Sequence, residues 1–439
     1  MKKSFLLNFV LMLISITCFV ACGDDNKDVT GPAYDPSKPV KLTTFYPDSG
    51  KYQEKVLLTG ENFGVDPNII RVYFNSKLAP VIGSTGKRMY VNAPRLPGDT
   101  CIISVVVGTD SVVYDNKFFR YKSEVTVTTL VGNGENSYQD GNLATMDSMW
   151  QGLATLRPQW VCIDKDDNVF VAHWHNGFHV ARINEDDNEM ITVGQNITAN
   201  VLAANQETGV IAFSTQNAIG QYVTLDPSNF WAPKYHQARW SNPIETPTNP
   251  YNPASVTNPT DGFIYTHFFN TGVMKINPQN WEAELIYPLS GATNAMTFRP
   301  TEPNILYMVM RSTSTYLPNT VITLDVTNPD STFKKLNTIT AAGHRDGAIE
   351  QAQFNDIRMI VSDTDGSIYM ADDRNHCIRR LTPDNMVETV LGIPGTPGWK
   401  DGGKKDALFQ NPSGIAVKSD GTVYVADYGN CRVRKLSIN

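Results

Sequence analysis

The feature that most constrains the fold is an internal repeat that runs through residues 124–439. Its two clearest copies, residues 352–381 and 407–436, share the pattern Ala-x-Phe, then Gly-x-x-Tyr-x-Ala-Asp, then an Asn and a basic segment that ends in Leu. A third copy covers residues 161–183, and three weaker copies centre on residues 210–213, 262–267 and 305–310. Six copies in series predict one architecture in which each unit buries its apolar face against its neighbours.

The spacing of the copies favours a β-propeller. The aligned positions lie 42, 52, 43, 62 and 55 residues apart, at His173, Thr215, His267, Met310, Asp372 and Asp427. Periods of roughly 40 to 50 residues are typical of propeller blades, and longer intervals carry loop insertions. Residues 125–132 are similar to 386–392, whereas the last copy ends at Leu436 without such a segment. We therefore expect residues 125–131 to pair with the C-terminal strand and close the ring, which would remove exposed sheet edges.

The two clearest copies resemble NHL repeats, whose units are four-stranded propeller blades. This resemblance implies an all-β fold with a six-bladed β-propeller over residues 123–439. Frequent Gly (31) and Pro (26) residues agree with many short strands joined by turns.

Residues 38–122 predict a small β-sandwich, because short alternating apolar runs recur between turn residues. The segment 46–50, followed by a strand and by Gly60-Glu61-Asn62-Phe63-Gly64, resembles the IPT/TIG immunoglobulin-like family. In this pattern Gly60 and Gly64 permit tight turns and Phe63 fills the end of the sandwich. The resemblance implies a spacer or interaction module.

The N-terminus has the form of a secretory signal at residues 1–21, with two lysines, an apolar run and a small residue. Cys22 follows directly and resembles the lipidated cysteine of a bacterial lipobox. The acidic run 23–28 is similar to a tag that exports lipoproteins to the outer face in some Gram-negative bacteria. Residues 22–37 would then be a tether, and the protein would be lipid-anchored on the outer membrane, facing the exterior. The alternative is a secreted protein cut near Ala21.

Composition and motifs exclude several classes. The net charge of −7 and pI near 5.5 give no basic footprint for nucleic acid. The four cysteines that remain after Cys18 and Cys22 are widely spaced, without a CxxC pair, so neither a zinc ribbon nor a dense disulfide framework is expected. No serine-nucleophile motif, phosphate loop or dinucleotide fingerprint is present.

In propellers, the turn after the second strand of each blade and the connection to the next blade share one face, where the ligand usually binds. The connection at residues 230–240 carries four aromatic residues, which we expect to form a long loop. Aromatic planes stack on pyranose rings, and planar polar groups bind sugar hydroxyls. The alternative is that these rings only pack the loop onto itself. The predicted ligand-binding residues are His173, Trp174, His175, Trp231, Tyr235, Trp240, His267, Arg311, Arg374 and Tyr428.

The histidines raise a metal hypothesis. His173, His175 and His267 could hold Zn²⁺ with an open position for water. The other blades offer Thr215 and Met310 at the equivalent position, and a His-x-His turn also arises by chance. No other cofactor is expected, and Asp372 and Asp427 are interpreted as turn-holding residues of the repeat.

The leading hypothesis is a cell-surface lipoprotein that binds an extracellular polysaccharide or oligosaccharide. A second hypothesis is a propeller hydrolase or lyase with a histidine-bound metal, in which the catalytic residues are not identified. A third is a protein-interaction scaffold of an outer-membrane uptake complex, because fold alone does not fix function.

Overall fold

A computed structural model describes residues 31–75, 77–95, 100–122, 125–134, 140–143, 157–174, 177–241, 247–249, 254–314 and 317–438. The predicted signal at 1–21 and Cys22 lie outside these ranges. The chain divides into two compact units, with the boundary between Arg120 and Tyr121. None of the helices within the described ranges is long and apolar enough to cross a membrane.

The first unit is built from two antiparallel sheets. One sheet has the order β1-β3-β7-β6 and the other β2-β9-β8-β4-β5. The strands are β1 (Lys41–Tyr46), β2 (Ser49–Gly50), β3 (Lys55–Glu61), β4 (Ile70–Phe74), β5 (Lys77–Ala79), β6 (Val81–Ser84), β7 (Arg88–Asn92), β8 (Thr100–Val107) and β9 (Asp110–Tyr121), with a 3-10 turn at Pro67–Ile69.

Alternation of side chains explains the core of this unit. Every second residue of β3 and β8 is buried, because successive strand residues point to opposite faces. The ring of Phe119 contacts Phe45 and Phe74, at 6.5 and 5.0 Å between centroids, and so joins the two sheets. Phe63 is fully buried, and a Cβ at Gly60 would lie 2.4 Å from its ring. Phe63 is thus buried as predicted, and Gly64 has the left-handed φ of +71° of a turn glycine. The turn predicted at Gly60 is wrong: Gly60 lies within β3, where a Cβ would collide with the Lys41 carbonyl oxygen as well as with Phe63.

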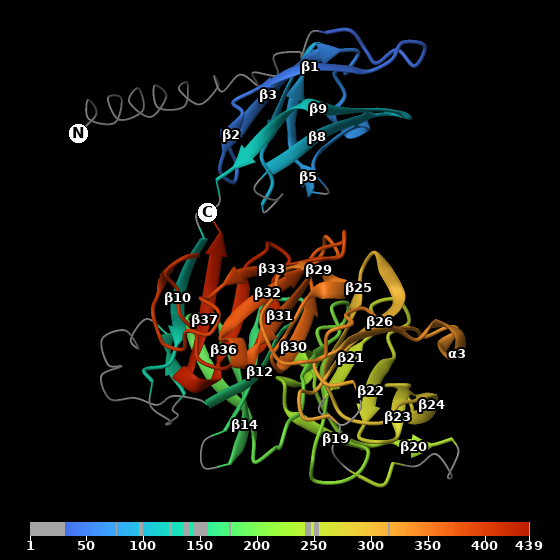
Figure 1. Cartoon of the computed structure of the whole chain (residues 1–439), viewed down its shortest axis with the longest axis vertical. Helices are drawn as coiled ribbons and strands as arrows, with labels where there is room; N and C mark the ends of the chain where they lie inside the picture. The colour runs from blue at the N-terminus through green and yellow to red at the C-terminus, as the bar shows by residue number, and fades with distance from the viewer. Residues whose placement is uncertain are drawn as a thin grey trace, which may run out of the picture. The chain divides into compact units, whose positions relative to one another are not determined.

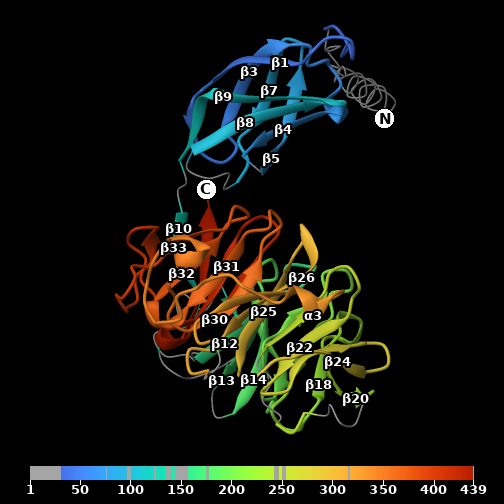
Figure 2. The same cartoon turned by 45° about the vertical axis from the view of Figure 1, so that its right-hand side comes forward.

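The second unit consists of six sheets of four or five strands (Figures 1 and 2). The first contains β11 (Gly141–Asn142), β12 (Arg157–Ile163), β13 (Val169–Trp174), β14 (Phe178–Asn184) and β15 (Glu189–Gln195), and the second contains β16 (Ala203–Ala204), β17 (Ile211–Ser214), β18 (Gln221–Leu225) and β19 (Pro233–Gln237). The third contains β20 (Arg239–Trp240), β21 (Ala254–Thr257), β22 (Ile264–Phe268), β23 (Gly272–Ile276) and β24 (Glu282–Pro288), and the fourth contains β25 (Thr293–Arg299), β26 (Glu302–Met310), β27 (Val321–Asp325) and β28 (Lys334–Lys335). The fifth contains β29 (Gly347–Ala348), β30 (Ile357–Ser362), β31 (Ile368–Asp372), β32 (Cys377–Leu381) and β33 (Met386–Leu391), and the sixth contains β34 (Gly402–Gly403), β10 (Val125–Val131), β35 (Pro412–Val417), β36 (Val423–Asp427) and β37 (Arg432–Ile438).

Helical structure in the described part of this unit is limited to short turns. These are α3 (Pro329–Thr332) and the 3-10 turns η2 (Pro227–Asn229), η4 (Ile349–Gln351), η5 (Asp373–Asn375) and η6 (Tyr428–Asn430).

The six sheets form a β-propeller-like arrangement. The first strands of successive sheets contact one another in the order β12, β16, β21, β25, β30 and β35, and β35 also contacts β12. The predicted pairing of residues 125–131 is present, because β10 lies antiparallel to β37 with Val127 opposite Leu436 (Figure 1). The second strands β22, β31 and β36 are buried at every position, because neighbouring sheets cover both of their faces.

The repeat aspartates hold their turns, as predicted. Asp372 accepts a hydrogen bond from the backbone N–H of Asn355 at 2.9 Å and another from the Asn375 amide at 2.8 Å. Its carboxylate also pairs at 2.8 Å with Arg379, whose side chain is fully buried. Asp427 makes the equivalent bonds with Gln410, Asn430 and Arg434.

Candidate functional site

The antiparallel sheets of the second unit have two ends, which we name by their turns. The first-turn end carries the turns between the first and second strands of each sheet, for example residues 258–263 and 363–367. The second-turn end carries the turns that follow the second strands, together with the starts of the first strands, because Arg157 at the start of β12 pairs with Trp174 at the end of β13. The ligand is predicted from the sequence to bind at the second-turn end.

Several predicted residues do lie at the second-turn end. His173 is buried and stacks on His179 at 5.4 Å between ring centroids, whereas Trp174 is 37% exposed. The guanidinium of Arg157 lies 4.6 Å over the ring of Tyr428. Arg311 follows β26 directly and Arg374 lies within η5. His175 lies outside the described residues.

The prediction of a long aromatic loop at residues 230–240 is wrong. Most of this segment is strand, because Pro233–Gln237 pairs with β18 as the outer strand of the second sheet. Its aromatic residues therefore separate rather than gather. Trp231 lies under the guanidinium of Arg182 at 4.5 Å, Tyr235 is exposed on β19, and Trp240 packs edge-on against Phe268 at 5.6 Å.

The histidines occupy different environments. His267 is fully buried, and its Nε2 donates to the carbonyl oxygen of Leu289 at 3.0 Å, because a carbonyl can only accept. Burial lowers the pKa of His267 to about 4, so its ring is neutral. Within the described ranges, no three His, Cys, Asp or Glu side chains are grouped as metal ligands. The triad with His175 stays a prediction.

The most distinctive polar group at this end surrounds Asp356 at the start of β30, which is 3% exposed. Its Oδ1 accepts hydrogen bonds from the Asn294 amide and the Ser312 backbone N–H, both at 3.2 Å, and thereby links the fourth and fifth sheets. Its Oδ2 faces Arg358 Nη1 at 3.9 Å and Arg374 Nε at 3.8 Å. We call Asp356, Ser312, Arg358, Asp373 and Arg374 the Asp356 cluster.

Three buried polar atoms of this cluster have no hydrogen-bond partner in the described structure: Ser312 Oγ, Arg358 Nε and Asp373 Oδ1. Burial raises the pKa of Asp373, although the neighbouring Asn411 amide and Arg358 oppose this rise. The ring of Trp160 lies 5.9 Å from the Arg358 guanidinium. Buried polar atoms are rarely left without hydrogen bonds in native proteins, so this group is a candidate binding site for a polar ligand.

Sequence reasoning found only Arg374 of this cluster. Asp356 lies just before β30 and Arg358 lies within it. Neither position belongs to the repeat pattern that can be recognised in the sequence. The left-handed φ of +66° at Asp356 is visible only in the structure, and it recurs at +51° at Asn411, which occupies the equivalent position of the sixth sheet.

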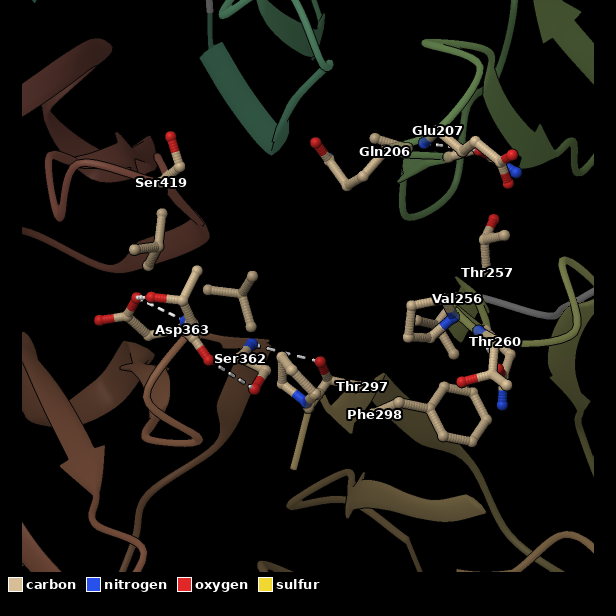
Figure 3. A pocket seen from close by; sticks show the side chains of 18 of the residues that line it. Gln206, Glu207, Val256, Thr257, Thr260, Thr297, Phe298, Ser362, Asp363 and Ser419 are labelled. Atoms are coloured by element: carbon tan, nitrogen blue, oxygen red, sulfur yellow. Dashed lines mark hydrogen bonds between the residues drawn. The ribbon is translucent and has the colours of Figure 1, made fainter. Parts of the chain in front are cut away.

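The first-turn end carries a cavity of about 420 Å³ (Figure 3). Residues from the second to the sixth sheets line it, among them Gln206, Thr257, Thr297, Ser362 and Ser419. Many of its polar atoms already bond to the protein itself: the Ser362 backbone N–H donates to Thr297 Oγ1 at 3.2 Å, and the Gln206 amide donates to the Ile163 carbonyl at 2.8 Å. None of the residues that line this hollow has a buried side-chain polar atom without a hydrogen-bond partner in the described structure, in contrast to the Asp356 cluster.

A further groove of about 650 Å³ runs beside the second and third sheets and is lined by Lys234, His236 and Trp281. The imidazole of His236 stacks on Trp281 at 4.1 Å between centroids and bonds Thr224 Oγ1 at 2.8 Å. The indole face is thus already covered by the protein.

Comparison with known proteins supports the two kinds of domain. The IPT/TIG domain model matches residues 39–121, and the NHL repeat model matches residues 409–436. The chain is 32% identical over 97 residues to Protein SUPPRESSOR OF QUENCHING 1 of Arabidopsis thaliana and 40% identical over 73 residues to mouse Teneurin-3. These matches cover 22% and 14% of the chain but only 9% and 3% of those much longer proteins.

Solved structures from Bacteroides are similar over most of the chain. A structural genomics protein of unknown function from Bacteroides thetaiotaomicron has a TM-score of 0.76 at 24% identity and covers 93% of this chain and 100% of its own. An auxiliary nutrient binding protein from the same species has a TM-score of 0.58 at 22% identity, with 92% and 99% coverage. At these identities the likeness shows a shared fold.

Proposed function

We propose that this protein is a cell-envelope binding protein that captures a polysaccharide or oligosaccharide nutrient. The ligand would bind at the second-turn end of a six-bladed β-propeller that is closed by β10 and β37. The observation that carries the proposal is the Asp356 cluster, where three buried polar atoms lack partners. The description of one similar structure as an auxiliary nutrient binding protein supports a binding role.

The chemistry of this end suits a sugar. Donors on Arg358 and Ser312 and an acceptor on Asp373 match hydroxyl groups, which both donate and accept. Trp174, which is partly exposed at the same end, offers an apolar surface for a pyranose ring. A small number of fixed polar groups beside aromatic surface is the usual composition of a ligand site.

The location proposed is the outer membrane, with Cys22 as the lipidated residue and the IPT/TIG domain as a spacer. Metabolic labelling with radioactive palmitate tests the anchor. Label should enter the protein and be lost in Cys22→Ser, while label retained by this variant would contradict the anchor.

The function is tested by electrophoresis of the purified chain through gels that contain individual polysaccharides, followed by mass spectrometry of the same mixtures. Retardation without cleavage products would support the binding role and identify the glycan class. Cleavage products would instead indicate a hydrolase or lyase. The absence of both, together with co-purification of a membrane protein, would favour a scaffold in an uptake complex.

A further inference from the structure

We infer that the ligand of the Asp356 cluster is an acidic saccharide, which places a carboxylate or sulfate between Arg358 and Arg374 and its hydroxyls on Asp373 and Ser312. This inference rests on the proposed function and names the class of its ligand.

The charges at this end favour an anionic ligand. At the ends of the second strands, in the described turns that follow them and at the adjoining strand starts, the charged side chains are five arginines and four aspartates: Arg157, Arg311, Arg358, Arg374, Arg432, Asp356, Asp372, Asp373 and Asp427. Positive charge therefore exceeds negative charge by one at the second-turn end, although the whole chain has a net charge of −7. A local charge opposite to that of the protein as a whole is a feature of sites that attract a charged ligand.

The guanidinium groups of Arg358 and Arg374 have N–H donors that are not hydrogen-bonded to Asp356. The contacts of Arg358 and Arg374 with Asp356 Oδ2, at 3.9 and 3.8 Å, are beyond hydrogen-bond length, so these guanidinium groups are held near the carboxylate by charge rather than by hydrogen bonds. Arg358 Nε is buried without a partner, and the Arg374 side chain is 56% exposed. Guanidinium groups bind carboxylate and sulfate-type anions strongly, through paired charge-assisted hydrogen bonds.

Asp356 does not itself accept hydrogen bonds from Arg358 and Arg374, because its carboxylate is held in place by other groups. Its Oδ1 is occupied by the Asn294 amide and the Ser312 backbone N–H. The Asp356 backbone N–H donates to Asn319 Oδ1 at 3.0 Å, which fixes the residue to the fourth sheet. The carboxylate is thus fixed in place. It attracts the two arginines by charge but leaves their N–H donors free to bind a ligand.

Asp373 supplies a hydrogen-bond acceptor beside the two arginines. Asp373 Oδ1 is buried and without a partner in the described structure, and a carboxylate oxygen would repel a bare inorganic anion. A ligand that offers both an anion and neighbouring hydroxyls satisfies the arginines and Asp373 at once. Acidic saccharides combine these two groups within a few ångströms.

The experiment measures binding of the purified chain to polygalacturonate, to the same polymer after its carboxyls are reduced to hydroxymethyl groups, and to a sulfated dextran. We expect at least about 10-fold weaker binding of the reduced polymer than of one of the two acidic polymers, because a charge-assisted hydrogen-bonded contact is lost. The preferred acidic polymer shows whether the anion is a carboxylate or a sulfate. Polyglutamate is the control for non-specific attraction between charges and should not bind comparably.

Arg374→Gln should weaken binding of the acidic polymer at least about 10-fold, and Arg358→Gln should do the same. Arg88→Gln removes one exposed arginine from β7 of the first unit and serves as the matched control, which should bind like the wild type. Arg374 is largely exposed, so its variant remains informative even if Arg358→Gln fails to fold. Equal binding of acidic and reduced polymers, unaffected by Arg374→Gln, would overturn the inference and leave the proposed function intact. Failure to bind any saccharide would contradict the proposed function itself.

Discussion

Arg434 and Arg358 belong to neighbouring sheets and each faces a buried aspartate, yet they use their donors in opposite ways. Arg434 is fully buried, and all of its N–H groups bond at 2.6–3.1 Å, to Asp427, Asp401 and two backbone carbonyls. Arg358 stays 3.9 Å from Asp356 and has a buried Nε without a partner. The comparison teaches that burial of a charged pair does not reveal its role, whereas the number of donors left unused does.

Arg379 repeats the arrangement of Arg434 in the fifth sheet, with the same five donors bonded to Asp372, Asp346 and two carbonyls. The repeat thus encodes a structural bracket in which one arginine joins the second-strand aspartate to the outer part of its sheet. Arg358 and Arg374 beside Asp356 depart from this pattern, and we assign them to the ligand.

The largest expected effect comes from breaking a closed bracket. Arg434→Met leaves Asp427 buried and unpaired, which should lower the free energy of unfolding by about 3–5 kcal/mol. Urea unfolding followed by tryptophan fluorescence measures this loss in the second unit, because all seven tryptophans lie after residue 149. A loss below about 1 kcal/mol would show that the bracket does not stabilise the fold.

A pH effect of similar size should come from His267. The pKa of its buried ring is about 4, against about 6.5 in the unfolded chain, so the unfolded chain takes up a proton first as the pH falls. The free energy of unfolding should therefore not depend on this histidine above pH 6.5, and it should fall by about 3 kcal/mol as the pH decreases to 4.

The control for this effect is His267→Gln, which keeps an N–H donor for Leu289 but does not titrate. The measurement is the difference between the two proteins in urea unfolding at several pH values. Parallel pH profiles would contradict a neutral buried His267.

The first-turn end supplies the next comparison. Thr297→Val removes the oxygen that accepts the Ser362 backbone N–H, so we expect a loss of about 1–2 kcal/mol in stability and unchanged saccharide affinity. Isothermal titration with the preferred polymer tests the second part. Weaker binding in this variant would move the ligand to the cavity of Figure 3.

Opening the Asp356 cluster should cost little stability. Arg374 is 56% exposed and makes only a long contact with Asp356, so Arg374→Gln should change the free energy of unfolding by less than about 0.5 kcal/mol. The same urea series measures it beside Arg434→Met. Strong destabilisation here would make Arg374 structural, like Arg434, and would remove the distinction on which the site rests.

The smallest effect is expected for the separated aromatic residues. Trp231 lies against Arg182 and Trp240 against Phe268, in different sheets, so the double change Trp231→Phe and Trp240→Phe should leave saccharide affinity within about twofold of the wild type. The measurement is the same titration. A large loss of affinity would return the site to residues 230–240.

Features that the repeat makes explicit could be predicted from the sequence. The paired strands 125–131 and 432–438 and the turn roles of Asp372 and Asp427 follow from similarity between copies. The prediction for the aromatic segment was wrong, because residues 233–237 pair with β18 as an outer strand, whereas the dense cluster of rings was interpreted as a loop. Asp356 and Arg358 could not be found, because their meaning comes from Asn294 and Ser312 of another sheet, about 60 and 45 residues away in the sequence.

The measurement that tests the central claim most directly is hydrogen exchange of the purified chain with and without the polysaccharide that it retards most. Bound ligand shields nearby backbone amides and suppresses local opening. The account predicts added protection at residues 353–358 and 373–376 of the second-turn end. Protection confined to residues 256–262 and 361–364, which line the cavity at the opposite end, would contradict it.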